Sequence, residues 1–326
     1  MKNIILALAA LLLQSEASVS HAETRSFSRI GSSFNREFLN DTNSLSEPLT
    51  KPAMAVAQFG TSSAFYIHSE DGKHYFGTAA HSAYAPIFRD GLDLGDLSAN
   101  SDLCKVFPNA LNSDSRIFRL GLANIDFKCK KLLLILPHID FAIFEAVPLD
   151  NKNVPVQGVS LNAAPALNAT PLSLLSYSSY LNPGLNRKLS LAYSSGHLCQ
   201  VISKEPLIKY IHNSLHQNSQ SIFRTPYIAT GCDAAAGDSG APLLNNITGA
   251  LAGVLSAIPV KQTYSMTSDD ALLLKLDGLL GIIRNSLIWN DLTYVVPIQS
   301  IQEELLNVIE TTTDEDLKHT LQNFFK

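Results

Sequence analysis

Residues 64–78 read AFYIHSEDGKHYFGT, and this stretch has the pattern of a β-hairpin. Two runs rich in aromatic and β-branched residues, 64–68 and 74–78, flank the pair Asp71-Gly72. An Asp-Gly pair favours the tight turn of an antiparallel hairpin, because both of its positions tolerate a positive φ. We therefore expect two paired strands here.

Short runs of the same kind recur along most of the chain. They cover residues 55–59, 115–120, 131–136, 141–147, 171–176, 189–194, 242–244 and 250–256. Turn residues separate them, and no helices alternate with them as a parallel α/β sheet would require. Many short strands of this kind indicate antiparallel sheets or barrels, so we expect an all-β fold.

The C-terminal end has helical periodicity instead. Five apolar residues recur at helical spacing after Pro297, namely Ile298, Ile301, Leu305, Leu306 and Ile309. A second short helix is expected over residues 314–325. The chain should therefore end in a helical tail, which we assign to residues 301–326.

The composition is that of a globular protein. The chain has 326 residues, enough for one large all-β unit or two modest domains. Hydrophobic residues make up 46% and charged residues 16%, which excludes a wholly disordered chain and a basic face for nucleic acid. The net charge of −5 is mild and predicts solubility rather than a particular partner.

Residues 1–22 have the pattern of a secretory signal peptide. Lys2 precedes an apolar run over residues 4–13, and Ser20 and Ala22 supply the small residues that signal peptidase requires. The run is about half the length of a membrane-spanning helix, and no later segment is long and apolar enough to span a bilayer. We expect a secreted or periplasmic protein without membrane contact after signal removal. An uncleaved anchor is the alternative.

Export would place the four cysteines in an oxidising compartment, where thiols tend to pair. Four cysteines allow three pairings. The most local one joins Cys104 to Cys129 and Cys199 to Cys232, and each bond would stabilise the fold by about 3 kcal/mol on the chain-entropy model. Free buried thiols are the alternative. The Cys and His spacings match no metal-binding pattern apart from His212 and His216 at i, i+4, which lack the intervening glutamate of a metalloprotease. We therefore expect neither a metal nor a cofactor.

Residues 237–242 read GDSGAP and are the most informative hexapeptide in the chain. Glycines on both sides of Asp238-Ser239 permit a tight turn that leaves backbone N–H groups free. Such groups stabilise the negative oxygen that forms when a serine attacks a carbonyl carbon. Ser239 is therefore a candidate nucleophile, and the N–H groups of Gly237 and Ser239 are candidates for an oxyanion hole.

A serine nucleophile needs a base within reach and a third group to orient that base. The stretch FGTAAH places His81 at the end of an expected strand, after small residues that let other backbone pack closely. The stretch HIDFAIF places Asp140 at the start of an alternating strand. Asp102 and Asp126 are other candidate acids, but neither is followed by such a strand. We expect His81, Asp140 and Ser239 to form a catalytic triad.

These three segments resemble the trypsin/chymotrypsin superfamily of serine proteases. Its members show Thr-Ala-Ala-His, Asp-hydrophobic-Ala-hydrophobic and Gly-Asp-Ser-Gly-Gly-Pro in this order, and the similarity covers roughly residues 53–301. The resemblance implies a chymotrypsin-like double β-barrel over residues 51–300, with a C-terminal helix and with the triad between the barrels. It also implies a serine endopeptidase that hydrolyses polypeptides through an acyl-enzyme, and we expect a monomer.

Departures from the animal members favour the exported bacterial branch near the glutamyl endopeptidases. Ser82 stands where animal trypsins have a cysteine, and Ala241 replaces the second glycine of the serine motif. Cys199 and Cys232 also resemble that branch, in which a cysteine shortly before the nucleophile is common.

Substrate preference depends on one ambiguous carboxylate. Asp233 lies six residues before Ser239, where trypsin-like enzymes carry the aspartate that selects Lys or Arg. The bacterial branch often has an aspartate there without this preference, so a structural role stays open. The residues expected to line the specificity pocket are Leu255, Ser256 and Ala257. Ser256 should also support the triad aspartate, and the insertion over 258–290 could form a lid or an exosite.

Residues 23–50 are rich in Ser, Asn, Thr and Glu and suggest a pro-segment or an N-terminal arm. In the resembled family, a newly freed N-terminus often docks on the aspartate that precedes the nucleophile, here Asp238. The Arg29–Ile30 bond resembles the family's activation site. An ordinary Arg-Ile pair in a loose arm is the alternative.

Two other functions compete with the endopeptidase. GDSGA nearly satisfies the nucleophile motif of α/β-hydrolase esterases, but that fold has the order Ser, acid, His, and only His319 follows Ser239. The other is a catalytically silent protease-like fold that binds a partner. All three catalytic residue types are present, so the sequence gives this alternative no direct support.

Overall fold

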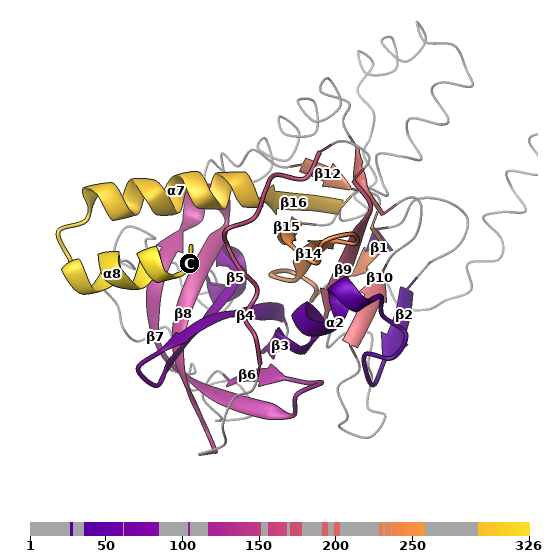
Figure 1. Cartoon of the computed structure of the whole chain (residues 1–326), viewed down its shortest axis with the longest axis horizontal. Helices are drawn as coiled ribbons and strands as arrows, with labels where there is room; N and C mark the ends of the chain where they lie inside the picture. The colour runs from indigo at the N-terminus through magenta and orange to yellow at the C-terminus, as the bar shows by residue number, and fades with distance from the viewer. Residues whose placement is uncertain are drawn as a thin grey trace, which may run out of the picture.

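The computed structural model describes residues 27–28, 36–60, 62–84, 104, 117–150, 156–167, 170–177, 191–194, 199–202, 228–230, 232–235, 237–257 and 293–326. The expected signal peptide, the Arg29–Ile30 bond and the 258–290 insertion lie outside these residues. The described strands form two β units, and two helices follow at the C-terminal end (Figure 1).

The first unit is a closed six-stranded barrel in the order β3-β4-β5-β8-β7-β6. Its strands are β3 (Val56–Phe59), β4 (Ser62–Glu70), β5 (Lys73–Ala79), β6 (Ile117–Leu120), β7 (Ile125–Leu136) and β8 (Phe141–Pro148). The expected hairpin joins β4 to β5, and Asp71 and Gly72 have φ values of 51° and 76°. Aromatic rings fill the interior, where Phe118 stacks on Phe59 and Phe76 with centroids 4.4 Å apart.

The second unit is an eight-stranded antiparallel sheet in the order β11-β12-β16-β15-β14-β9-β10-β2. Its strands are β2 (Arg36–Leu39), β9 (Leu172–Ser176), β10 (Leu191–Ser194), β11 (Val201–Ile202), β12 (Ile228–Thr230), β14 (Pro242–Asn245), β15 (Leu251–Ala257) and β16 (Thr293–Pro297). A separate two-stranded pairing joins β1 (Phe27–Ser28) to β13 (Ala234–Ala235). Figure 1 shows the orange strands β14 and β15 beside the indigo and magenta strands of the barrel.

Two short helices, α2 (Glu47–Met54) and α3 (Ala80–Tyr84), precede β3 and follow β5. The C-terminal helices are α7 (Ile298–Thr311) and α8 (Glu315–Asn323), and α7 begins directly after β16. Four of the five apolar positions expected in α7 are buried, whereas Leu306 is 48% exposed. The Asp314 carboxylate caps α8 by accepting a hydrogen bond from the Leu317 N–H at 3.0 Å.

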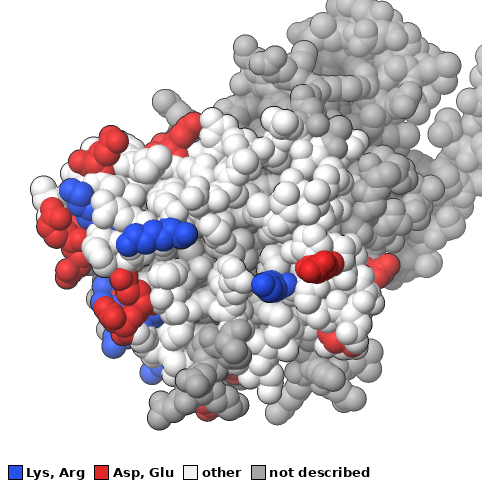
Figure 2. All heavy atoms as spheres, in the orientation of Figure 1, with Lys and Arg blue, Asp and Glu red and all other residues white. Residues whose placement is uncertain are grey.

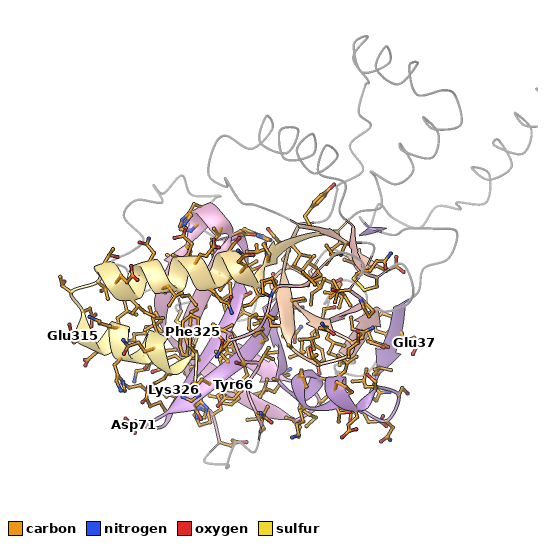
Figure 3. The ribbon with its side chains drawn as sticks, turned by 45° about the horizontal axis from the view of Figure 1, so that its top comes forward. Glu37, Tyr66, Asp71, Glu315, Phe325 and Lys326 are labelled. Atoms are coloured by element: carbon orange, nitrogen blue, oxygen red, sulfur yellow. A yellow bond between two sulfur atoms is a disulfide. The ribbon has the colours of Figure 1, made fainter. Side chains whose placement is uncertain are left out.

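The end of α8 packs on the β4–β5 hairpin of the barrel. The Asn323 side chain donates a hydrogen bond to Glu70 at 2.6 Å, and the ring of Phe324 contacts Tyr75 edge to face. Figure 3 labels Lys326 at this end of the chain and Asp71 in the hairpin turn. On the face drawn in Figure 2, charged side chains gather at this end of the molecule, and the middle of the face is largely uncharged.

The expected fold class is confirmed: the protein is mostly β, with a closed barrel, a second antiparallel sheet and helix at the C-terminus. The domain boundaries themselves stay predictions, although β2 already places residues 36–39 in the second sheet. The most local cysteine pairing is present, as Cys104–Cys129 and Cys199–Cys232. Within the described part of the chain, no helix is both long and apolar enough to cross a membrane.

Candidate active site

His81 and Asp140 meet because of how β5 and β8 pair. The register places Ala79, at the end of β5, opposite Phe141, at the start of β8. His81 follows two residues after Ala79 in α3, and Asp140 directly precedes Phe141. Asp140 has a left-handed backbone with φ 53°, and its carbonyl oxygen accepts a hydrogen bond from the Ala80 N–H at 3.1 Å. The strand register therefore delivers two side chains that lie 59 positions apart in the sequence.

The Asp140 carboxylate is buried and holds His81 through two groups. Nδ1 of His81 lies 2.8 Å from Oδ2 and 3.1 Å from Oδ1 of Asp140, and the His81 backbone N–H donates to Oδ1 at 2.8 Å. The Ser256 hydroxyl donates a further hydrogen bond to Oδ2. Because the carboxylate accepts from Nδ1, that nitrogen carries the proton, and Nε2 of the neutral ring is the basic atom.

The environment of His81 has opposing effects on its pKa. Burial of the ring lowers the pKa, while the charge of Asp140 and its hydrogen bond raise it. The two contributions of Asp140 together prevail, so the pKa of His81 lies above its ordinary value of 6.5. About a third of the side chain, 34%, stays exposed. His81 is thus held by Asp140 while part of its side chain stays exposed.

Ser239 sits on the tight turn that the flanking glycines predicted. Gly237 and Gly240 have φ values of 92° and 85°, a region that side-chain-bearing residues rarely occupy. Gly240 also has no room for a side chain, because a Cβ there would lie 2.1 Å from Thr78 Oγ1 and 2.2 Å from the Ser63 carbonyl oxygen. Its N–H donates to the Leu255 carbonyl oxygen at 2.8 Å, which fastens the turn to β15.

The Ser239 hydroxyl points toward the same strand that supports Asp140. Its Oγ donates to the Ser256 carbonyl oxygen at 3.5 Å, and among the described residues it forms no hydrogen bond to His81. Ser256 lies at a β-bulge between Leu255 and Ala257 of β15. A bulge re-aims side chains locally, and here the hydroxyl of Ser256 reaches Asp140 while its carbonyl faces Ser239. The structure therefore joins the candidate base His81 to the candidate acid Asp140, whereas the candidate nucleophile Ser239 has no direct hydrogen bond to His81 among the described residues.

The two N–H groups expected to form an oxyanion hole are unengaged. Within the described part of the chain, neither the Gly237 nor the Ser239 N–H donates a hydrogen bond. The Asp238 carbonyl between them accepts from the Ala241 N–H at 2.8 Å, and this bond fixes the peptide that carries the Ser239 N–H. Asp238 itself is buried, and its Oδ1 accepts a hydrogen bond from the Ser176 hydroxyl at 2.8 Å.

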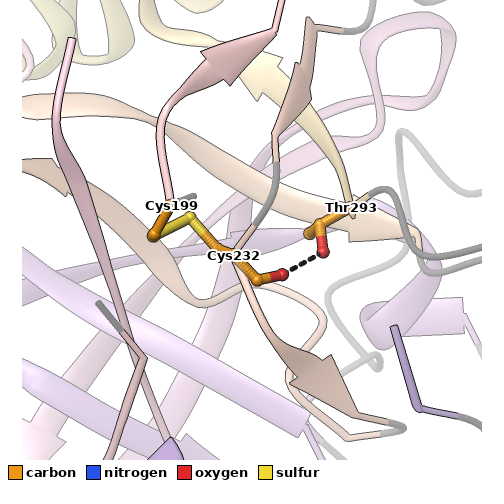
Figure 4. Close-up of a disulfide and its surroundings, with 3 residues drawn as sticks. All are labelled: Cys199, Cys232 and Thr293. Atoms are coloured by element: carbon orange, nitrogen blue, oxygen red, sulfur yellow. Dashed lines mark hydrogen bonds between the residues drawn. A yellow bond between two sulfur atoms is a disulfide. The ribbon is translucent and has the colours of Figure 1, made fainter. Parts of the chain in front are cut away.

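Asp233 is buried beside the second disulfide. It follows Cys232, which is bonded to Cys199 and whose carbonyl oxygen accepts a hydrogen bond from Thr293 Oγ1 at 2.6 Å (Figure 4). Ala234 and Ala235 of β13 come next and lead toward Gly237. The segment before the nucleophile is therefore anchored on both sides, and the expected pocket residues Leu255, Ser256 and Ala257 all lie in β15.

Sequence reasoning did not find three residues that hold the site, Ser63, Ser176 and Tyr177. Ser63 lies at the start of β4, Ser176 is the last residue of β9, and Tyr177 directly follows it. All three are buried, and they form hydrogen bonds to residues 237–240, which we call the nucleophile turn, or to one another. For Ser63 and Ser176, the only sequence signal is a serine inside an apolar strand, and this signal does not tell what the hydroxyl contacts.

Comparison with known proteins gives structural likenesses only. No protein-family model and no curated protein matches the chain. Among solved structures, an inactive form of a variant of Rv3671c from M. tuberculosis H37Rv is 14% identical, with a TM-score of 0.45, over 82% of this chain and 92% of that one. A second inactive form of the Rv3671c protease is also 14% identical, with a TM-score of 0.42, over 80% and 92% of the two chains.

A variant of the HtrA-type protease AlgW with a tripeptide is 15% identical, with a TM-score of 0.43, over 81% of this chain and 63% of that one. The placement near the glutamyl endopeptidases stays a prediction. Because all three TM-scores lie below 0.5, the assignment of function depends on the geometry of this chain.

Proposed function

We propose that this protein is a serine endopeptidase in which His81, Asp140 and Ser239 are the catalytic residues. The observation that carries the proposal is the buried Asp140 carboxylate, which holds Nδ1 of His81 at 2.8 Å and accepts a hydrogen bond from Ser256. Ser256 also faces the Ser239 hydroxyl through its carbonyl oxygen. One strand thus supports the acid and lies against the nucleophile.

In the proposed reaction, substrate binding turns the Ser239 hydroxyl from the Ser256 carbonyl oxygen toward Nε2 of His81. Nε2 takes the hydroxyl proton while Oγ attacks the carbonyl carbon of a peptide bond. The N–H groups of Gly237 and Ser239 stabilise the negative oxygen of the tetrahedral intermediate. His81 then gives the proton to the leaving amine, and a water molecule, activated by the same nitrogen, hydrolyses the acyl-enzyme.

Asp140 has two roles in this proposal. Its hydrogen bond fixes the ring tautomer, which leaves Nε2 as the basic nitrogen. Its charge stabilises the imidazolium that forms during attack, and this is the same interaction that raises the pKa of His81. The Ser256 hydroxyl holds the carboxylate in place for both roles.

The substrate class is a polypeptide. The preference of the enzyme for the side chain before the scissile bond depends on the role of Asp233. Leu255, Ser256 and Ala257 would line the pocket for the residue before the scissile bond, and Asp233 would read a basic side chain or serve the fold. Profiling cleavage sites on a peptide library decides between these roles. Cuts after Lys and Arg that disappear in Asp233→Asn support the first role, and cuts after other residues support the second.

The two disulfides and the N-terminal sequence pattern support a protein that works outside the cytoplasm. The disulfides join Cys104 to Cys129 in the barrel region and Cys199 to Cys232 beside the candidate site. Location in a periplasm or in the medium therefore belongs to the same proposal.

One observation favours a catalytically silent binding module as the second candidate. The Ser239 hydroxyl bonds to the Ser256 carbonyl oxygen and not to His81, so the described site has no direct link between nucleophile and base. For an esterase of the α/β-hydrolase class, the strand pairing is unfavourable. That fold requires parallel strands, whereas the described ladders are antiparallel.

Labelling with a fluorophosphonate tests the proposal, because this reagent reacts only with an activated serine. We expect the wild-type protein to be labelled at Ser239 and to cleave casein, and we expect Ser239→Ala and His81→Ala to do neither. Ser173→Ala is the control, since Ser173 is buried in β9 and its hydroxyl has no hydrogen-bond partner among the described residues. A folded, properly processed wild-type protein that shows neither labelling nor cleavage overturns the endopeptidase proposal in favour of the binding module.

A further inference from the structure

Ser63 of the barrel donates two hydrogen bonds to the turn that carries Ser239. The residue is fully buried. Its backbone N–H donates to the Ser239 carbonyl oxygen at 2.9 Å, and its hydroxyl donates to the Gly237 carbonyl oxygen at 3.4 Å. The two acceptors lie on either side of Asp238, so one residue of the first β unit holds both ends of the turn in the second.

The direction of the Ser63 hydroxyl proton follows from its other partner. The Tyr177 N–H donates to Ser63 Oγ at 3.0 Å, so this oxygen acts as an acceptor toward Tyr177. A hydroxyl has one proton, which is then available for the Gly237 carbonyl oxygen. Tyr177 directly follows Ser176, whose own hydroxyl donates to Asp238. The end of β9 thus supports the turn twice, once directly and once through Ser63.

Ser63 is also tied to the strand that carries the candidate base. Its carbonyl oxygen accepts a hydrogen bond from Thr78 Oγ1 at 2.7 Å, and Thr78 lies in β5, three residues before His81. Thr78 Oγ1 and the Ser63 carbonyl oxygen together occupy the space next to Gly240. Ser63 therefore lies between the base and the nucleophile and fixes the spacing of the two elements that carry them.

We infer that Ser63 is a positioning residue for the reaction of Ser239, and this inference rests on the proposed endopeptidase function. Gly237 lacks a Cβ and has a positive φ, so its backbone has more rotational freedom than that of any other residue type. The Ser63 hydroxyl holds the Gly237 carbonyl oxygen and thereby limits rotation of the Gly237–Asp238 peptide, which lies in the chain between the two N–H groups that are the proposed oxyanion donors. Its function is to keep the Gly237 and Ser239 N–H groups aimed at the forming oxyanion.

This role differs from that of a buried hydroxyl whose hydrogen bond only stabilises the fold. A hydroxyl that only stabilises the fold changes the unfolding temperature and leaves the rate constants of the folded enzyme unchanged. A hydroxyl that holds the oxyanion donors changes the stability of the transition state more than that of the bound substrate. The affinity for a transition-state analogue separates these two roles.

The experiment compares Ser63→Ala with Ser173→Ala in the full chain. Both variants remove a buried hydroxyl, but the Ser173 hydroxyl has no hydrogen-bond partner within the described part of the chain. The measurements are kcat and KM on a peptide substrate and the inhibition constant of a peptidyl boronic acid. All are taken well below the unfolding temperature of each variant, and fluorophosphonate labelling supplies the number of competent sites.

We expect Ser63→Ala to lower kcat about tenfold with KM within about twofold, and to weaken the boronic acid about tenfold in parallel. Ser173→Ala should keep wild-type values for all three quantities. Ser63→Cys retains most of the volume with a weak S–H donor, and it is the variant to measure if Ser63→Ala does not fold. It should show the same loss in kcat and in boronic acid affinity.

Different results overturn different statements. A wild-type enzyme that is active, together with a folded Ser63 variant whose kcat and boronic acid affinity are unchanged, overturns the role of Ser63 alone. The same holds if Ser63→Ala and Ser173→Ala lose activity equally, or if only KM changes. A wild-type protein that is neither labelled nor active overturns the endopeptidase function, and the role of Ser63 falls with it.

Discussion

The hydroxyl of Ser256 donates a hydrogen bond to Oδ2 of Asp140, although the two residues come from different β units and lie 116 positions apart. Ser256 reaches Asp140 because β15 has a bulge between Leu255 and Ala257. Asp140, which holds His81, is therefore itself held by a residue of the second sheet. The site depends on how the two units are placed against each other.

Replacing Ser256 by alanine should leave the Asp140 carboxylate with fewer hydrogen bonds and a less fixed orientation. Because a hydrogen bond to a charged group is stronger than one between neutral groups, we expect kcat/KM to fall about tenfold, or about 1.4 kcal/mol in transition-state free energy. Steady-state kinetics on a peptide substrate measure this change, with Ser173→Ala as the control. Wild-type kcat/KM in a folded Ser256→Ala would contradict a supporting role.

The pH dependence of kcat/KM should report the neutral fraction of His81 in the free enzyme. The base must be unprotonated, and Asp140 raises the pKa of His81 above 6.5, so activity should rise with pH through a midpoint above 6.5. In Asp140→Asn the raising interactions are lost and burial, which lowers the pKa, remains. The His81 pKa measured by NMR titration should therefore fall, and kcat should drop by up to about 10⁴-fold.

A midpoint at or below pH 6.5 in the wild-type protein would argue against His81 as the base. An unchanged His81 pKa in Asp140→Asn would show that the contact between the two side chains does not control the titration. NMR on the folded variant needs no activity, so this second readout stands even where the rate is too low to measure.

Gly240→Ala should destabilise the protein strongly for two separate reasons. The left-handed backbone costs a residue with a Cβ roughly 1–2 kcal/mol, and the new methyl group would collide with Thr78 Oγ1 and the Ser63 carbonyl oxygen. We expect a loss of about 3 kcal/mol or more in the free energy of unfolding, measured by urea denaturation. Fluorophosphonate labelling should fall as well, since the turn carries Ser239.

Gly72→Ala separates the two causes. Gly72 also has a positive φ, of 76°, but a Cβ there would meet no atom within 4 Å. It should lose only the backbone contribution, roughly 1–2 kcal/mol, and keep full labelling. Equal losses in the two variants would mean that close packing around Gly240 contributes nothing.

The buried His74 should make the barrel less stable in mild acid. His74 is 8% exposed, its Nδ1 lies 3.2 Å from the Tyr66 hydroxyl, and its ring contacts Phe127. Burial lowers the pKa of His74 below 6.5, so between 6.5 and the folded-state pKa the unfolded chain binds a proton that the folded chain does not. The stability present above pH 6.5 is therefore lost progressively as the pH falls through this window.

His74→Leu should reduce this pH dependence by up to one proton, as measured by urea unfolding at pH 7.5 and 5.5. Tyr66→Phe is the matched control, because it removes the hydrogen bond while the imidazole stays buried, and its pH dependence should be retained. A His74→Leu variant with the wild-type slope would assign the acid sensitivity to other groups.

Much of the fold could be predicted because its signals are local. Asp71-Gly72 specifies a turn through its two positive φ angles, and the alternating run after Asp140 specifies a strand, now seen as β8. The glycines around Ser239 specify a tight turn for the same reason of backbone freedom. The choice of the most local disulfides also proved correct, since short loops close at a lower entropy cost than long ones.

The sequence alone determined the β4–β5 hairpin, strand β8, helix α7 and the residue types at the candidate site, because backbone propensity and hydrophobic alternation act over a few positions. It did not indicate strands such as β2, β12 and β16. The contact of Ser256 with Asp140 was already expected from the resemblance, whereas only the tertiary structure decided that Ser63 reaches Gly237 and that the Ser239 hydroxyl faces Ser256. These contacts join residues far apart in the chain. A serine has the same local pattern whether its hydroxyl meets a carboxylate, a carbonyl group or, as at Ser173, no partner. The packing of the barrel against the sheet decides which.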